Sequence, residues 1–248
     1  MSGPSVFLWA ALLSLLSAAG NPPQKPAPLA AETKAGPAEF LNGAESLTYS
    51  INWPGGATLG EAHLQAGKTG DGWQFDFSLN ASVPGFAVSD HYRSRTNANF
   101  CALELEKQAQ HGSRKAHERT VFEYKEGKAT RTTLVEGGGH TDIDISDCAH
   151  DGLDFIYYAR REMALGHGVP KPQDVLFGAM YAVRMDYAGV EDVVVGGKHR
   201  QADHIMLNVR GPASDARAEL FLARDAARTP LMVRVPFALG TFSMELVR

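Results

Sequence analysis

Apolar and polar side chains alternate along most of the chain from residue 45 onward. In residues 47–53 the large side chains of Leu47, Tyr49, Ile51 and Trp53 fall on one face of an extended strand, and the residues between them are polar. Residues 73–83 keep the same alternation. This period of two is typical of antiparallel strands that bury one face and expose the other. The pattern predicts further strands near residues 58–66, 88–97, 101–109, 118–125, 128–135, 140–146, 178–188, 190–196, 200–209, 216–223, 230–237 and 240–247.

Glycine-rich turns separate the predicted strands, for example at residues 54–56, 70–72, 137–139 and 196–197. Connections this short favour antiparallel pairing between successive strands, which produces a meander. About a dozen strands with one apolar face have to curl, because a flat sheet would leave that face and its edges exposed. We therefore expect one mainly β domain over residues 40–248, curled into a barrel or half-barrel whose concave side carries the apolar residues.

One segment interrupts the alternation, because residues 152–164 have the spacing of an amphipathic helix. Leu153, Ile156, Tyr157 and Arg160 share one stripe along this helix, and Ala164 follows them. We expect the stripe to pack on the sheet or across an opening of the barrel.

Two acidic residues stand at the start of this helix. Asp151 at the N-cap, with Asp154 three residues later, approximates a capping box. Negative charge at this position also meets the positive end of the helix dipole. The same carboxylates beside His150 could form an acid–base pair. We favour the capping role because such caps are common.

The N-terminal region has the features of an export signal. Residues 6–16 are apolar and uncharged, and small residues follow at 17–19, although no Lys or Arg precedes the apolar run. We expect a signal peptide over residues 1–19, a proline- and alanine-rich spacer over residues 20–39, and a periplasmic or secreted protein. The apolar run is short for a membrane span, and the alternative is an uncleaved N-terminal anchor.

Composition and motifs exclude several functions. A net charge of −4 argues against nucleic acid or an anionic membrane as the main partner. The sequence has no Gly-x-Ser-x-Gly or His-Glu-x-x-His motif of a hydrolase. His140, Asp142 and Asp144 would share one face of a strand, but a straight strand holds carboxylates too far apart for calcium. We expect no metal and no cofactor.

Three stretches of the chain carry a family resemblance. Residues 45–62 (ESLTYSINWPGGATLGEA) have the pattern of a hairpin in which a Tyr-containing strand runs through Trp and Gly into a Gly-bearing return strand. Residues 151–160 (DGLDFIYYAR) have the pattern of a helix, and residues 222–231 (LARDAARTPL) that of a turn. In order and spacing they resemble an uncharacterised family of bacterial exported proteins catalogued as domain of unknown function 3108. The resemblance implies an exported, mostly antiparallel β domain without an assigned activity.

The chain contains two cysteines, Cys101 and Cys148. An even number in an exported protein favours a disulfide bond over two free thiols. Such a bond would anchor the start of the helix against the sheet. The alternative is a pair of reduced cysteines in a cytosolic protein.

The leading functional hypothesis is an envelope protein that binds an apolar or amphipathic, lipid-like ligand inside its curved sheet. Tyr157, Arg160 and Tyr181 are the candidate ligand-binding residues. The alternative is a structural or assembly factor with a filled barrel, which contacts another envelope protein. An enzyme is the third reading, because no catalytic set stands out.

Residue size on the inward face does not decide between the first two hypotheses. Bulky side chains argue for a filled interior, and small ones argue for space. The bulky set is Trp73, Phe75, Phe77, Tyr181, Tyr187, Phe237 and Phe242, and the small set is Ala62, Ala66, Ala81 and Ala218.

Overall fold

The computed structural model describes residues 43–83, 86–212, 215–237 and 240–248. The predicted signal peptide (1–19) and spacer (20–39) lie outside these ranges. The described residues form fifteen strands and one helix, so the mainly β architecture is confirmed.

The strands and the helix have the following bounds: β1 Ala44–Asn52, β2 Thr58–Thr69, β3 Gly72–Val83, β4 Phe86–Thr96, β5 Ala102–His111, β6 Arg114–Glu123, β7 Lys128–Thr133, β8 His140–Asp144, β9 His150–Asp151, α1 Asp154–Ala164, β10 Gln173–Leu176, β11 Met180–Val195, β12 Lys198–Arg210, β13 Asp215–Ala223, β14 Pro230–Phe237 and β15 Gly240–Leu246.

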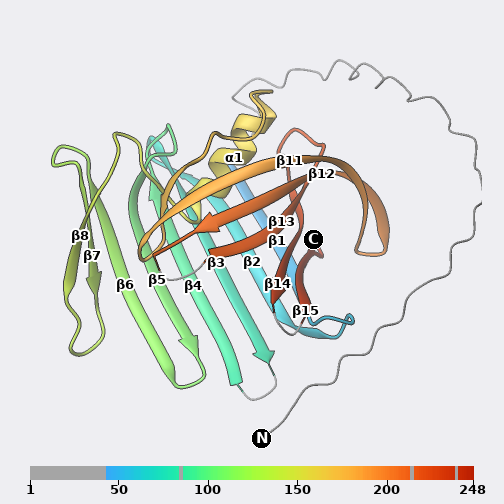
Figure 1. Ribbon diagram of the computed structural model, residues 1–248, viewed down its shortest axis with the longest axis horizontal. Helices are drawn as coiled ribbons and strands as arrows, with labels where there is room; N and C mark the ends of the chain where they lie inside the picture. The colour runs from blue at the N-terminus through green and yellow to red at the C-terminus, as the bar shows by residue number, and fades with distance from the viewer. Residues whose placement is uncertain (1–42, 84–85, 213–214, 238–239) are drawn as a thin grey trace, which may run out of the picture. The chain divides into compact units, whose positions relative to one another are not determined.

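All fifteen strands belong to one sheet, which is made of two meanders. Strands β1 to β8 pair in sequence, and so do β10 to β15. The first and last strands, β1 and β15, join the two meanders by antiparallel pairing. Figure 1 shows the resulting sheet curling so that β11 and β12 lie across from β3 to β6. The sheet is not closed by strand pairing, because its order ends at β8 on one side and β9 on the other.

Several details differ from the sequence prediction, and the short strands β9 and β10 were not expected at all. Residues 178–188 and 190–196 were predicted as two strands, but they form the single strand β11. The glycine between them, Gly189, occupies a bulge with φ of 125° rather than a turn. Strand β9 pairs with β10 in parallel, an exception to the antiparallel prediction. The parallel pair is possible because α1 lies between the two strands in the chain.

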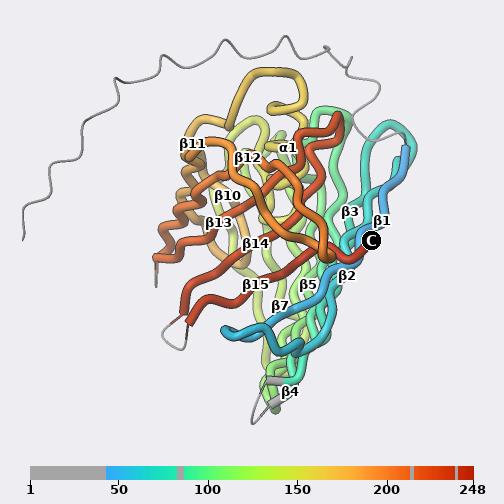
Figure 2. Tube along the Cα trace, turned by 90° about the vertical axis from the view of Figure 1, so that its right-hand side faces the viewer, coloured from blue at the N-terminus to red at the C-terminus, as the bar shows by residue number. Residues whose placement is uncertain are grey.

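Helix α1 packs inside the curl and contacts both halves of the sheet. Tyr157 lies in an apolar cluster with Tyr49 of β1 and Phe75 of β3. Phe155 and Met163 lie in a second cluster, with residues of β10 to β13. The predicted single stripe is therefore too narrow, because the sheet curls around the helix and buries two of its sides. In Figures 1 and 2 the helix lies at one end of the sheet.

A seam ties the start of β5 to the segment that precedes α1. Cys101 and Cys148 form the predicted disulfide bond, with Cα atoms 4.8 Å apart. Next to it, the backbone N–H of Ala102 donates to the carbonyl oxygen of Ala149 at 2.9 Å. The hydroxyl of Tyr124 donates to the carbonyl oxygen of Ala102 at 2.6 Å. The sheet is thus joined across its curl at β5, and β6 to β8 continue beyond the seam.

Candidate functional site

A row of apolar side chains crosses five strands on the inner face of the sheet. Ile51 pairs with Met244, Met244 with Val233, Val233 with Leu220, and Leu220 with Ile205. The first three are only partly buried, whereas Leu220 and Ile205 belong to the core. Partial exposure on an inner face means that protein atoms do not cover these side chains completely.

The partly exposed apolar surface continues on both sides of this row. Phe77 and Leu79 of β3, and Leu207 and Val209 of β12, also face inward and are partly buried. Their inward direction follows from register, because Phe77 pairs with the buried Leu64. We call the end of the sheet that carries the β1–β2, β3–β4 and β14–β15 turns the distal end. It lies away from α1 in Figures 1 and 2.

The end of the sheet that holds α1 is filled instead. The ring of Tyr157 stacks on Phe75 with centroids 4.1 Å apart. Ala62 and Ala66, the small residues that suggested space, are buried in the same cluster as Tyr157. The small side chains therefore make room for the helix at this end. The interior is thus filled at the end that holds α1, whereas apolar side chains remain partly exposed toward the distal end.

Arg160, a predicted ligand-binding residue, lies in a buried ion pair. Its guanidinium group donates to both carboxylate oxygens of Glu45, at 2.8 and 2.6 Å. It also donates to the carbonyl oxygens of Ala227 and Arg228. A two-point Arg–carboxylate pair is among the stronger contacts in proteins. Arg160 is fully buried, so its guanidinium group serves a structural ion pair and is not exposed to a ligand.

Of the other two predicted ligand residues, only Tyr181 is accessible. Tyr157 is fully buried, and burial raises the pKa of its hydroxyl well above the ordinary value. Tyr181 lies on β11 and is partly buried beside the second cluster. It pairs with the buried Val175 of β10.

A buried polar cluster holds the start of α1. Asp151 accepts hydrogen bonds from the backbone N–H groups of Leu153 and Asp154, at 2.8 and 2.9 Å. Asp154 in turn accepts one from the N–H of Asp151, at 2.7 Å. These reciprocal bonds have the pattern of a capping box, although Leu153 directly precedes the first helical residue. The hydroxyl of Ser94 adds a bond to Asp151 at 2.6 Å.

Burial decides the charge state of this cluster. It raises the pKa values of Asp151 and Asp154 well above the ordinary range. It lowers the pKa of His150 to about 4, although His150 Nδ1 lies 2.6 Å from Asp154. All three side chains are almost inaccessible to solvent. The cluster therefore offers no surface to a substrate, and its geometry serves the helix start.

The turn between β10 and β11 lies on the inner face of β4 to β7. Phe177 packs edge-on against Tyr92, with ring centroids 5.2 Å apart. The amino group of Lys107 lies 5.0 Å above the same Phe177 ring. Arg131 donates a hydrogen bond to the carbonyl oxygen of Gly178. The sequence did not predict this contact, because Phe177 and Gly178 are far along the chain from Tyr92, Lys107 and Arg131.

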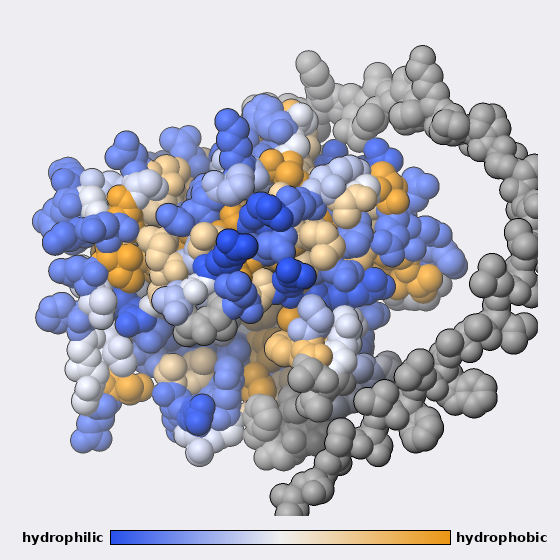
Figure 3. Space-filling view, viewed as in Figure 1, coloured by the Kyte–Doolittle hydropathy of each residue, from blue (hydrophilic) through white to orange (hydrophobic). Residues whose placement is uncertain are grey.

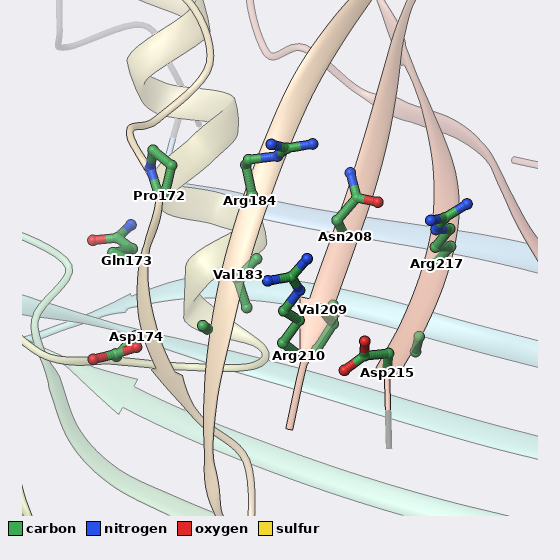
Figure 4. A pocket seen from close by; sticks show the side chains of 12 residues that line it. Pro172, Gln173, Asp174, Val183, Arg184, Asn208, Val209, Arg210, Asp215 and Arg217 are labelled. Carbon is green, nitrogen blue, oxygen red and sulfur yellow. The ribbon is translucent and has the colours of Figure 1, made fainter. Parts of the chain in front are cut away.

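A polar groove lies on the other side of the sheet, over β10 to β13. It has a volume of about 500 Å³ and carries Arg184, Arg210 and Arg217, with Asp174 and Asp215 among its other lining residues. Figure 4 shows these side chains along neighbouring strands. Figure 3 shows hydrophilic side chains gathered over β11 and β12 on this side. The alternation of the sequence predicted a polar outer face but not a groove.

The described residues contain no group of three or more His, Cys, Asp or Glu side chains placed to hold a metal ion. His140, Asp142 and Asp144 are exposed on β8, at the edge of the sheet. Nor does the described part of the chain include a helix with the length and apolar character needed to cross a membrane.

Comparison with known proteins identifies the family. No curated protein matches the sequence significantly. The fold is similar to the crystal structure of a β-barrel-like protein of domain of unknown function DUF1849 from Brucella abortus. The TM-score is 0.60 at 9% sequence identity, over 83% of this chain and 96% of that one. Residues 48–247 match the family described as protein of unknown function DUF3108. The chain therefore belongs to the DUF3108 family.

Proposed function

We propose that this protein binds an apolar or amphipathic, lipid-like molecule on the inner face of its sheet, between the distal end and α1. The observation that carries the proposal is the row Ile51–Met244–Val233, where inward-facing apolar side chains remain partly exposed. Binding sites for small molecules are usually concave and mostly apolar, with a few polar groups. The inner face has this composition.

Helix α1 would form the closed end of the site. It is fixed by the seam, by the capping bonds of Asp151 and by the Arg160–Glu45 pair. A ligand entering from the distal end would meet the aromatic cluster of Tyr157 and Phe75, which limits its depth. Tyr181 would contribute a half-buried ring and a hydroxyl at the side of the site.

We place this activity outside the cytoplasm, in the periplasm or as a secreted protein. The disulfide bond supports export, because such bonds persist in oxidising compartments. Peptide mapping of protein recovered from cell fractions tests this location. Two free thiols in the native protein would contradict it.

The second candidate is a structural or assembly factor that contacts another envelope protein through its outer face. The groove over β10 to β13 favours it, because Arg184, Arg210 and Arg217 could bind acidic side chains. The two candidates use opposite faces of the sheet, so they respond to different substitutions.

A pair of matched variants tests the ligand proposal. Val233→Asp places a charge on the inner face, and Val194→Asp places the same charge at an exposed position of β11, 51% accessible. The probe is N-phenyl-1-naphthylamine, whose fluorescence rises in apolar surroundings. We expect binding to the wild type and to Val194→Asp, and loss of binding in Val233→Asp. Ile51→Asn provides a second inner-face change if Val233→Asp unfolds.

Native mass spectrometry of protein purified without detergent provides an independent measurement. A bound lipid-like mass would support the proposal, and extraction would identify the molecule. Equal probe binding by all variants, together with protein that carries no such mass, would refute it.

A further inference from the structure

Two neighbouring hairpin ends at the distal end, those of β1–β2 and β14–β15, carry an aromatic rim. We define the aromatic rim as Trp53, Pro54, Phe237 and Phe242. The rings of Trp53 and Phe242 meet edge to face with centroids 4.9 Å apart, and those of Phe237 and Phe242 do so at 5.3 Å. Phe237 is 60% exposed.

Register places these turns side by side. Asn52 at the end of β1 pairs with Thr58 of β2 and with Ser243 of β15. The distal end of β3, which belongs to the β3–β4 hairpin, adjoins them, because Gly60 of β2 pairs with Ala81 of β3. Pro54 also packs closely on Gly240, where a Cβ atom would lie 2.7 Å from the proline ring. The rim is thus a packed feature of the fold, and its outermost ring still faces solvent.

The chain through these three turns carries no charge. No Asp, Glu, Lys, Arg or His stands between Glu45 and Glu61, between Asp76 and Asp90, or between Arg234 and Glu245. Charged residues make up 21% of the whole chain, so the fold gathers three unusual segments at one end. Large exposed apolar patches on a soluble domain mark interaction sites.

Basic residues flank the uncharged turns on both sides. Arg114 and Lys115 are exposed at the β5–β6 turn, next to the β3–β4 hairpin in the sheet order. On the other flank, Arg210 and Arg217 adjoin the β12–β13 turn, with Asp215 as an acidic neighbour. Uncharged aromatic tips between basic residues are complementary to an anionic lipid surface. Aromatic rings settle at the headgroup level, and Lys and Arg are attracted to anionic headgroups.

We propose that the aromatic rim docks the protein onto an anionic lipid surface. The net charge of −4, which argues against an anionic membrane as the main partner of the whole chain, averages over all faces; at these hairpins Arg114, Lys115, Arg210 and Arg217 stand against the nearby acidic residues Glu61, Asp90 and Asp215. The biological purpose of this docking rests on the proposed function. A docked protein would let a lipid-like ligand pass from the membrane to the inner face without crossing water. The rim residues lie at the distal end, where the partly exposed inner face begins.

Vesicle co-sedimentation tests the docking directly. The full chain is mixed with vesicles of phosphatidylcholine, alone or with phosphatidylglycerol, and compared with Phe237→Asp and Val194→Asp. Both positions are exposed, at 60% and 51%, so neither change should unfold the protein. We expect Phe237→Asp to weaken binding roughly tenfold, the loss expected when a buried phenyl ring is removed from the lipid. Val194→Asp should bind as the wild type does.

The basic flank gives a second readout. Arg114→Glu combined with Arg210→Glu should reduce binding to the anionic vesicles more than to phosphatidylcholine, and the difference should shrink at high salt. Wild-type protein that leaves the vesicles in solution, or Phe237→Asp that binds them as well as the wild type, would overturn the inference. Concentration-dependent dimerisation that Phe237→Asp abolishes would also overturn it, because the rim would then contact a second copy.

The two proposals can fail separately. Vesicle binding without binding of N-phenyl-1-naphthylamine would leave the docking in place and remove the ligand function. Probe binding without vesicle binding would do the reverse.

Discussion

Replacing Cys101 and Cys148 with alanine removes the covalent part of the seam and should destabilise the protein strongly. The two residues are separated by 47 positions, so the bond closes a loop that contains β5 to β8. In the chain-entropy relation a loop of this length restricts the unfolded chain by about 4 kcal/mol at 25 °C. The variant keeps the backbone hydrogen bond from Ala102 to Ala149, so we expect it to fold.

Urea unfolding followed by circular dichroism measures the effect. With a slope of about 3 kcal/mol per molar urea, the midpoint should fall by about 1.3 M. The slope should also rise, because an unfolded chain without the link exposes more surface. Substitution with alanine also removes two sulfur atoms, and Cys101 is buried. Reduced wild-type protein is therefore the control, because it keeps both sulfur atoms and lacks only the bond. If oxidised and reduced wild type share one midpoint within about 0.3 M, the link does not act through the unfolded chain and the reasoning is wrong.

Three further substitutions test the core. Glu45→Gln should lower the free energy of unfolding in urea by about 3–5 kcal/mol, because it leaves the fully buried Arg160 without its carboxylate. The double variant with Arg160→Met should recover part of this loss. If the double variant instead loses the sum of the two single losses, the pairing is contradicted. The folded pKa of His150 is about 4 and its unfolded value about 6.5, so only the unfolded chain binds this proton between those pH values. The contribution of His150 to the unfolding free energy should therefore fall by up to about 3 kcal/mol as pH drops from 6.5 to 4. The neighbouring carboxyl groups act in the opposite direction, because their pKa values are raised in the folded state. The difference in unfolding free energy between wild type and His150→Asn should nevertheless show the fall. Gly60→Ala would bring a Cβ atom within 2.0 Å of a backbone oxygen on β3, whereas Gly67→Ala meets nothing within 4 Å; thermal melting should show a large loss for the first variant and little change for the second.

Alternation in the sequence was enough to predict most strands and their inner faces. A period of two assigns each side chain to a face without knowledge of the partner strand. Tyr49, Ala62 and Phe75 were expected on the inward face, and all three are buried. The disulfide bond was predicted from the number of cysteines and the expected compartment, and the helix from its period.

Other features depend on contacts between residues that are distant in the chain. Glu45 and Arg160 are 115 positions apart, and neither has a local pattern that identifies its partner. Gly189 separated two predicted strands, because a glycine between two alternating runs looks the same whether the strand ends there or continues through a bulge. Whether the strand continues past it is decided by pairing with β12.

The sequence by itself determined most of the strands, the helix, the face of most side chains in those strands, and the three uncharged segments. Only the tertiary structure decided that β1 pairs with β15, that the sheet curls around α1 on two sides, and that the uncharged segments meet at one end. The physical reason is that local patterns depend on backbone geometry within a few residues. The joining of distant strands depends on which apolar surfaces can be buried together once the whole sheet has curled.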